Sequence, residues 1–303
     1  MIISKLRKSF SNLFRMDSIL ENKMRLSLLR ERNLSSKEMG IEQQLYIDKP
    51  VVVSLTTYGK KIHEVYLVIE SIFQQTVQAN KVVLWLSDKD FSLSSIPQTL
   101  KNQVRRGLDI RFCKDIRSYT KVVYAFQEFQ GCHIISIDDD IVYPFDMIER
   151  FIRSYEKDHS KIYFNKGHKM IYDKKKDKMR PYIEWVQKSN IKGSSLYYLP
   201  LGVYGIFYPE GILNKDVLNQ ELFLKLCPTA DDIWFKAMSM LEGIECEVVQ
   251  PGSVNVNDFI SIELNRERSL ARINVDEKAN DFQIQKVFEY YNIFKFFNHE
   301  KSC

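Results

Sequence analysis

The feature that most constrains the fold is a short apolar run that stops abruptly at three consecutive acids, Asp138, Asp139 and Asp140. Gly131 precedes the run, and Pro144 follows the acids. An apolar stretch of this length between two turn signals is typical of a parallel-sheet strand that is covered on both faces. We therefore predict a buried strand with carboxylates at its tip.

These acids favour a cation site at the edge of a sheet. Side chains alternate across a strand, so Asp138 and Asp140 point to one side and Asp139 to the other. Two carboxylates on one side can converge on a single cation, and hard oxygen ligands suit magnesium or manganese. The alternative is that the acids form a solvated turn or cap a helix that starts near Pro144.

Strands and helices alternate from Pro50 onward. The apolar patterns predict strands over 51–57, 82–86 and 110–113, and helices over 62–78 and 121–129. This alternation predicts an α/β fold with a doubly wound, mostly parallel sheet and helices on both faces. Ligands bind such sheets beyond the carboxyl ends of the strands. The polar residues at these ends would then gather near the acids, and they are Ser54, Thr56, Asp88 and Asp115.

A second pair of acids, Asp231 and Asp232, opens a predicted helix that Gly243 ends. Thr229 with Asp232 three residues later fits a capping box, which gives Asp232 a structural role and leaves Asp231 unexplained. Acids in the first turn lie at the positive end of the helix dipole, which keeps carboxylates ionised. Such carboxylates are suited to act as ligands or bases.

The rest of the second half is less regular. Two glycines three residues apart in the apolar stretch 199–209 indicate a close approach of the backbone to another group. We also predict a helix over 145–159, a solvated loop or hairpin in the lysine-rich stretch 165–195, a strand over 246–250 and a helical tail over 281–297.

The amino-acid composition limits the classes of function that the protein can have. The 303-residue chain has a formal net charge of +5, which suits anionic small molecules or an anionic membrane surface but does not indicate a nucleic-acid partner. It has no apolar run of about 18 residues and no signal peptide with a cleavage site. The cysteines are odd in number and widely spaced, which predicts reduced thiols and a cytoplasmic protein; they are Cys113, Cys132, Cys227, Cys246 and Cys303.

The first 49 residues are polar and helix-prone. Four basic residues precede the first acid, Asp17, and apolar residues recur near helical spacing. One interpretation is a basic amphipathic helix on the cytoplasmic face of an anionic inner membrane, and the other is a helix that packs on the domain or frays at the terminus.

Four stretches together resemble the bacterial glycosyltransferases of the nucleotide-sugar-dependent GT-A fold, in particular family-2-like enzymes of surface polysaccharide synthesis. These stretches are Val53–Tyr58, Leu84–Ser87, Ile137–Pro144 and Cys227–Trp234. The third matches the Asp-x-Asp motif, which in that family holds the metal that bridges the donor diphosphate. The resemblance implies a GT-A-like catalytic domain over 50–285, preceded by a basic helical segment over 1–49 and followed by a helical tail over 286–303.

The resemblance also implies roles for single residues. Asp232 matches the second acid of the family's Glu/Asp-Asp motif and would be the catalytic base, with Asp231 the close alternative. Asp140 would bind the metal, and Asp138 would bind both the nucleotide and the metal. The other residues expected to border the nucleotide or diphosphate are Ser54, Thr56, Asp88, Lys121 and Asp139.

The expected activity is transfer of a sugar from a nucleotide-sugar donor to a hydroxyl of a saccharide or lipid-linked acceptor in capsule or lipopolysaccharide synthesis. A divalent metal, manganese or magnesium, would neutralise the leaving phosphate while a carboxylate deprotonates the acceptor, and a one-step attack inverts the anomeric centre. The chain lacks the Gln-x-x-Arg-Trp motif of processive synthases, which favours single addition. The alternatives are another magnesium-dependent phosphoryl or nucleotidyl transferase, a phosphohydrolase, or a non-catalytic polysaccharide-binding scaffold of the same fold.

Overall fold

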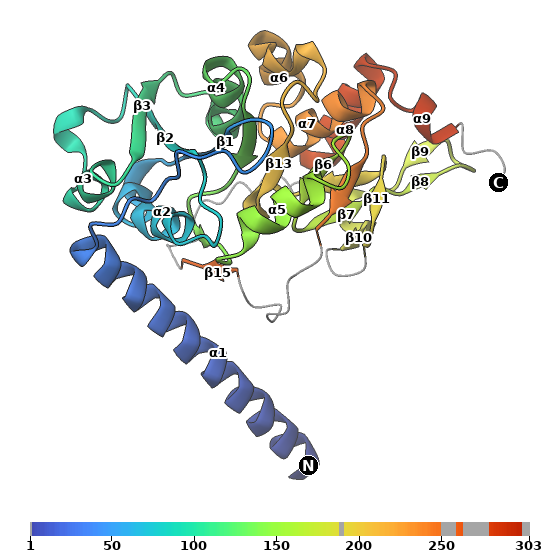
Figure 1. Ribbon diagram of the computed structural model, residues 1–303. Helices are drawn as coiled ribbons and strands as arrows, with labels where there is room; N and C mark the ends of the chain where they lie inside the picture. The colour runs from blue at the N-terminus through green and yellow to red at the C-terminus, as the bar shows by residue number, and fades with distance from the viewer. Residues whose placement is uncertain (1, 188–190, 250–258, 263–278, 299–303) are drawn as a thin grey trace.

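The computed structural model describes residues 2–187, 191–249, 259–262 and 279–298 and has an eight-stranded sheet at its centre (Figure 1). Four of the seven strand pairings in this sheet are parallel. The predicted α/β class with a mostly parallel sheet is confirmed. The strand order is β11 (Ser194–Ser195), β14 (Cys246–Val248), β6 (Ile162–Phe164), β13 (Ile206–Tyr208), β4 (His133–Ser136), β1 (Val51–Thr56), β2 (Lys81–Ser87) and β3 (Leu108–Cys113).

Helices cover both faces of this sheet, as predicted. In β1, Val53 and Leu55 belong to the apolar cluster that contains Ile69 of the first of these helices, α2. Val52, which directly precedes Val53, packs on the other face with Ala125 of α4. The helices are α2 (Val65–Phe73), α3 (Gln98–Val104), α4 (Thr120–Glu128), α5 (Met147–Tyr155), α6 (Gln220–Leu226), α7 (Asp231–Leu241), α8 (Ala279–Tyr290) and α9 (Lys295–Asn298).

The strand order places β4, and therefore the acidic strand tip, among the inner strands of the sheet. Strand β4 is parallel to β1 on one side and antiparallel to β13 on the other. A short strand, β5 (Ile141–Val142), follows the acids and pairs with β15 (Ile260–Ser261), which forms a separate two-stranded ladder. The acids are therefore flanked by the loop after β1 and by the turn that leads into β13.

Some elements differ from the predictions. The helix expected over 62–78 begins only at Val65, because a 3-10 turn over Gly59–His63 precedes it, and it ends at Phe73. Helix α3 was not predicted, and neither was the small antiparallel sheet of β10 (Val186–Gln187), β7 (Gly167–Lys169) and β12 (Tyr198–Pro200). The lysine-rich stretch does contain a hairpin, made of β8 (Tyr172–Asp173) and β9 (Lys178–Met179).

The first 49 residues contain one long helix, α1 (Ile2–Ser35), which extends away from the body of the protein (Figure 1). Its C-terminal part is anchored: Leu29 is buried in the core, and the Asn33 amide donates to the carbonyl of Thr99 at 3.0 Å. Within the described part of the chain, no helix is both long enough and apolar enough to cross a bilayer. The four cysteines that the structure describes are free, and Cys303 lies outside the described residues.

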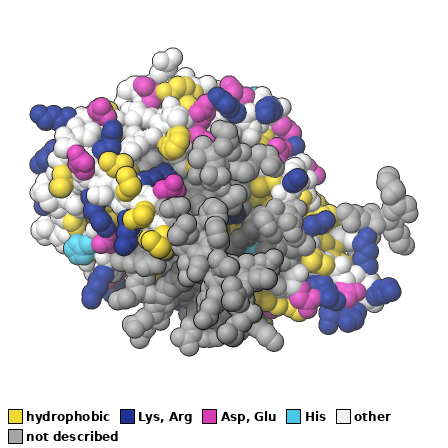
Figure 2. Space-filling view, turned by 90° about the horizontal axis from the view of Figure 1, so that it is seen from below, with side chains coloured by type: hydrophobic (Ala, Val, Ile, Leu, Met, Phe, Trp, Pro, Cys, Tyr) yellow, Lys and Arg dark blue, Asp and Glu magenta, His cyan; other side chains and the backbone are white. Residues whose placement is uncertain are grey.

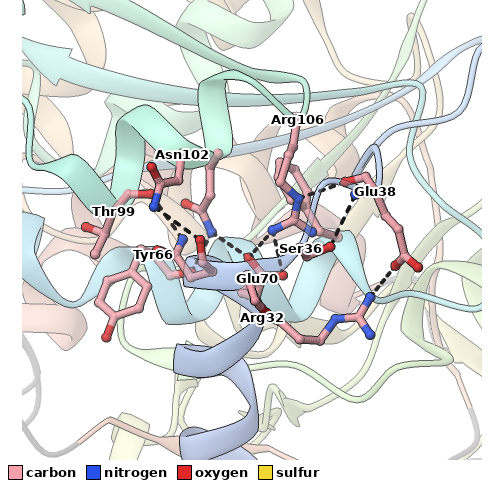
Figure 3. A network of polar contacts seen from close by, with 12 residues as sticks. Arg32, Ser36, Glu38, Tyr66, Glu70, Thr99, Asn102 and Arg106 are labelled. Atoms are coloured by element: carbon pink, nitrogen blue, oxygen red, sulfur yellow. Dashed lines mark hydrogen bonds and ion pairs between the residues drawn. The ribbon is translucent and has the colours of Figure 1, made fainter.

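A buried ion pair fixes the segment after α1 against α2 and α3 (Figure 3). The Arg106 guanidinium donates to both carboxylate oxygens of Glu70, at 2.9 and 2.8 Å, and neither side chain is more than 3% exposed. Arg106 also donates to the backbone carbonyl of Glu38 at 2.7 Å, and Glu38 in turn accepts from Arg32 of α1. The pair therefore couples the docking of α1 to the body.

We expect the substitution Arg106→Ala to lower the free energy of unfolding by about 3–5 kcal/mol, because it leaves the Glu70 carboxylate buried without its partner. Urea denaturation monitored by circular dichroism measures this change. Arg105→Ala is the matched control, since Arg105 is exposed, and it should change stability by less than about 0.5 kcal/mol. Equal effects of the two substitutions would contradict the role given to the buried pair.

Candidate functional site

The acidic tip of β4 is held in place by a buried tyrosine. The backbone N–H of Asp138 donates to the Tyr143 hydroxyl at 2.9 Å, and this hydroxyl donates to the carbonyl of Val203 at 2.8 Å. Tyr143 is completely buried. The acids are therefore fixed relative to the turn that contains Gly202 and leads into β13.

A lysine from the loop after β1 binds two of the acids. The Lys61 ammonium lies 2.8 Å from Asp139 Oδ1 and 3.0 Å from Asp140 Oδ2, while the Thr57 hydroxyl donates to Asp139 Oδ2 at 2.7 Å. Burial raises the pKa of Asp139, and Lys61 opposes this shift. Burial alone would lower the pKa of Lys61, but the two carboxylates hold it above its ordinary value. Lys61 therefore remains charged at neutral pH.

A second lysine connects the acidic tip to the start of α7. The Lys121 ammonium, supplied by α4, hydrogen-bonds Asp138 Oδ1 and lies 3.7 Å from Asp231 Oδ2. Its side chain is only 8% exposed. Burial opposes the charged form, but Asp138, Asp231 and Asp232 together raise the pKa of Lys121 well above its ordinary value. The acids at the strand tip and the acids at the helix start thus meet at one ammonium group.

The prediction of a capping box at the start of α7 is wrong. The helix begins at Asp231, its N-cap is Ala230, and no side chain caps it. Thr229 does not cap the helix because its hydroxyl accepts from the Gln283 amide at 2.9 Å instead. Both acids therefore lie in the first turn, near the positive end of the helix dipole.

The Asp232 carboxylate accepts from the backbone of the turn before β13, and it does not cap its own helix. Its two carboxylate oxygens accept from the N–H of Gly202 at 3.1 and 3.2 Å. A Cβ atom at Gly202 would lie 2.9 Å from Asp232 Oδ1 and 3.2 Å from Lys121 Nζ, so a side chain at this position would displace the carboxylate or the ammonium group. The glycine spacing noted in the sequence thus corresponds to a close approach at the site.

Burial, together with the neighbouring Asp231, raises the pKa of Asp232 to about 8, although Lys121 and the Gly202 N–H oppose the shift. The Asp232 carboxyl is therefore mostly protonated at neutral pH and titrates close to it. In the unfolded chain the same group loses its proton near its ordinary pKa of 3.8. Between these values the folded state binds the extra proton, so this group makes folding less favourable as the pH rises toward 8.

Asp138 and Asp140 fit the coordination of a divalent metal in part. Their side chains are 30% and 35% exposed, whereas Asp139 is 8% exposed and both its oxygens are already bonded. Among the described residues, no three or more His, Cys, Asp or Glu side chains are grouped to hold a metal ion. Magnesium is commonly bound by one or two carboxylates, with substrate phosphates supplying further ligands. Two accessible carboxylates match that pattern.

The other predicted residues lie along the same sheet edge but differ in accessibility. Ser54 is completely buried, and its hydroxyl donates to the carbonyl of Lys121 and accepts from the Trp85 indole at 2.9 Å. Thr56 donates to the carbonyl of Trp85 at 3.0 Å. Asp88 follows β2 and is exposed. The two hydroxyls thus join strands and α4, while Asp88 faces solvent near the edge.

Sequence reasoning missed three residues of the site, Lys61, Thr57 and Gly202 in its contact with Asp232. Lys61 and Thr57 both lie in the loop after the first strand, which the predicted topology already placed beside the acidic strand. The predicted adjacency of this loop and the acidic strand was the signal that could have identified Lys61 and Thr57. The contact of Gly202 with Asp232 joins residues thirty positions apart, and no local pattern marks it.

Comparisons with known proteins find similarity only at the level of structure. No protein-family model matches the chain, and no curated protein matches it. The mannosyltransferase PcManGT from Pyrobaculum calidifontis, in complex with GDP-Man and Mn2+, has a TM-score of 0.49 and 13% identity, over 95% of this chain and 76% of that one. S. aureus TarS 1–349, in complex with UDP, has a TM-score of 0.45 and 14% identity, over 67% and 58%. HddC from Yersinia pseudotuberculosis has a TM-score of 0.34 and 16% identity, over 54% and 78%.

We expect Lys121→Met to lower the free energy of unfolding by about 3–5 kcal/mol at neutral pH, because it leaves the carboxylates of Asp138 and Asp231 facing each other without a cation. The loss should be larger at about pH 9 than at about pH 6, since Asp232 ionises between these values. Urea denaturation at both pH values measures it. Lys101→Met, at an exposed position, is the control. A pH-independent loss would contradict the electrostatic role of Lys121.

Proposed function

We propose that this protein is a metal-dependent glycosyltransferase that moves a sugar from a nucleotide-sugar donor to an acceptor hydroxyl. The observation that carries the proposal is the meeting of two acidic groups, one at a strand tip and one at a helix start, around the Lys121 ammonium. One group is suited to hold a cation and the other to accept a proton. The sequence resemblance to GT-A glycosyltransferases points to the same reaction.

The charge balance of the site supports a requirement for metal. The site has two ammonium groups, from Lys61 and Lys121, against five carboxyl groups, from Asp138, Asp139, Asp140, Asp231 and Asp232. Even with Asp232 protonated, the carboxylates outnumber the lysines. A diphosphate would be repelled by this excess of negative charge unless a further cation entered with it.

Asp138 and Asp140 would hold the metal, which when bound neutralises the charge that develops on the leaving diphosphate. Lys61 pairs with Asp140 and Lys121 pairs with Asp138, and these contacts fix the positions of the two carboxylates. Asp88 and Thr56 border the same edge and would approach the nucleoside. Asp139 is engaged by Thr57 and Lys61, so its contribution is to hold the loop after β1 against the acidic tip.

Asp232 is the residue that we assign as general base. A base works best when its pKa lies near the operating pH, and the pKa of Asp232 is raised to about 8. The Gly202 N–H fixes its carboxylate, and the bound hydroxyl would transfer its proton to an Asp232 oxygen as it attacks the anomeric carbon. A single attack of this kind inverts the anomeric centre. Asp231 lies next to Asp232 and raises its pKa, which makes it a positioning residue and the alternative base.

The acceptor that we propose is a saccharide or lipid-linked saccharide, in surface polysaccharide synthesis of the capsule or lipopolysaccharide type. We further propose a cytoplasmic location with peripheral contact to the inner membrane. The mildly basic net charge and the helix α1 support the membrane contact.

The metal requirement predicts that the protein slowly hydrolyses one member of a panel of nucleotide sugars only when manganese or magnesium is present. Release of the nucleoside diphosphate, measured by chromatography, reports this activity. Asp140→Asn should reduce it by about 10²-fold or more, since a neutral amide is a weaker ligand for a hard cation. Glu156→Gln, which changes an exposed acid away from the site, is the control.

Hydrolysis that persists unchanged in a metal chelator would contradict the metal half of the proposal. A preference for simple phosphate esters over nucleotide sugars would instead indicate a phosphohydrolase. Absence of any turnover or nucleotide binding would indicate a scaffold that has the same fold.

The base assignment predicts that Asp232→Asn lowers kcat by about 10²–10⁴-fold with little change in donor affinity. In the unmodified protein, kcat/KM should fall about tenfold per pH unit below about 8, because the base must be ionised. The Asn variant should lose this limb of the pH profile. Glu242→Gln, an exposed position at the far end of α7, should retain the activity and the profile. Full turnover in the Asn variant would transfer the role to Asp231.

A further inference from the structure

Helix α1 contacts the body through one side of its C-terminal part. Leu29 is buried in the core, Asn33 is 1% exposed, and Leu26 packs against the same apolar cluster. The Arg25 guanidinium donates to the backbone carbonyl of Tyr143, the residue whose hydroxyl holds the N–H of Asp138. The helix is therefore anchored to a residue that itself contacts the acidic tip of β4.

The opposite side of α1 carries exposed apolar residues. Met16, Leu20, Met24 and Leu28 recur every fourth residue, and each is more than half exposed. Residues at this spacing lie on one face of a helix. Leu29 does not share this face, so the apolar row is directed away from the side that docks on the body.

In the sequence, apolar residues recur at the same helical spacing before Met16. Steps of three and four residues back from Met16 reach Leu13, Phe10 and Leu6. The helix has 34 residues and is therefore about 50 Å long. Figure 1 shows the helix projecting below the rest of the protein.

Charge favours an anionic surface as the occupant of this face. The first sixteen residues contain four basic side chains and no acid, namely Lys5, Arg7, Lys8 and Arg15. Each basic residue near an anionic bilayer strengthens binding by about fivefold. A second copy of α1 packed in parallel would instead bring these like charges together. Asp17 also falls among the apolar positions, which suits a hydrated headgroup layer better than a dry helix–helix seam.

We propose that α1 binds the surface of an anionic lipid bilayer through its free apolar face, and that this contact turns the acidic edge of the sheet toward the membrane. Two observations support the orientation. The helix is anchored at Tyr143, beside the acids. It projects to the side of the protein on which β15 lies, and the N–H of Ile262, just after β15, donates to the carbonyl of Asp140 at 2.8 Å (Figure 1).

Figure 2 views this lower side of the protein. On its described part, hydrophobic side chains are mixed with basic and acidic ones rather than gathered in one patch. We therefore assign the contact with the apolar layer to the exposed apolar residues of α1. The acceptor would then be a molecule that the membrane presents, such as a lipid-linked saccharide, and this consequence alone rests on the proposed function.

Co-sedimentation of the full chain with lipid vesicles tests the membrane contact. We expect binding to vesicles of phosphatidylcholine mixed with phosphatidylglycerol, weaker binding to phosphatidylcholine alone, and weakening by salt. The double variant Leu20→Glu/Met24→Glu should bind at least about tenfold more weakly, because two buried apolar contacts are lost. Leu93→Glu/Ile183→Glu makes the same chemical change at two exposed apolar residues away from α1 and should bind normally.

The proposal fails when the unmodified chain does not sediment with anionic vesicles, or when the two double variants lose binding equally. Light scattering adds a further outcome. A dimer that Leu20→Glu/Met24→Glu converts to a monomer, together with absent vesicle binding, would assign the apolar face to a second copy and overturn the proposal.

Activity assays separate this proposal from the proposed function. In buffer without vesicles, Leu20→Glu/Met24→Glu should hydrolyse the preferred nucleotide sugar as fast as the unmodified chain. With native membrane vesicles as the source of acceptor, its transfer of labelled sugar into solvent-extractable lipid should fall at least about tenfold. Vesicle binding without any hydrolysis would contradict only the proposed function. Transfer solely into water-soluble material would contradict the orientation toward the membrane.

Discussion

The structure of the site depends on one ammonium group, that of Lys121, which lies between carboxyl groups from two different elements of the fold. Lys121 comes from α4, Asp138 from the tip of β4 and Asp231 from the start of α7, and these segments meet only in the folded protein. The backbone of Lys121 is fixed as well, because its carbonyl accepts the Ser54 hydroxyl of β1. Without this cation, the carboxylates of Asp138 and Asp231 would face each other unpaired, which is unfavourable.

The topology of the sheet explains why the acids meet there. Antiparallel β13 runs beside β4, so the turn that enters β13 lies at the same edge as the end of β4. That turn contains Gly202, whose N–H binds Asp232, and Val203, whose carbonyl accepts the Tyr143 hydroxyl. One turn therefore supports both the acidic tip and the assigned base. The raised pKa of Asp232 and the proposed cation site near Asp138 therefore depend on the same set of contacts.

Local patterns in the sequence predicted the elements well and their contacts less well. The apolar periodicity identified β1, β2, β4 and α7, because burial on a sheet or helix face imposes a period on the residues themselves. The acidic strand tip was placed at the sheet edge, and Asp231 and Asp232 were placed at a helix start, where α7 does begin. The capping box failed because tertiary contacts took its residues: Thr229 binds Gln283, and Asp232 binds Gly202. Lys61 was missed because its partners lie almost eighty residues away.

The central claim is that the acidic edge of the sheet binds a nucleotide-sugar donor together with a divalent metal. Its most direct test is a calorimetric titration of the unmodified protein with nucleoside diphosphates, with and without manganese. Because carboxylates outnumber lysines at the sheet edge, the claim predicts that one nucleoside diphosphate binds with manganese, at least about tenfold more tightly than without it. Equal affinity with and without the metal, or no binding in either condition, would contradict the claim.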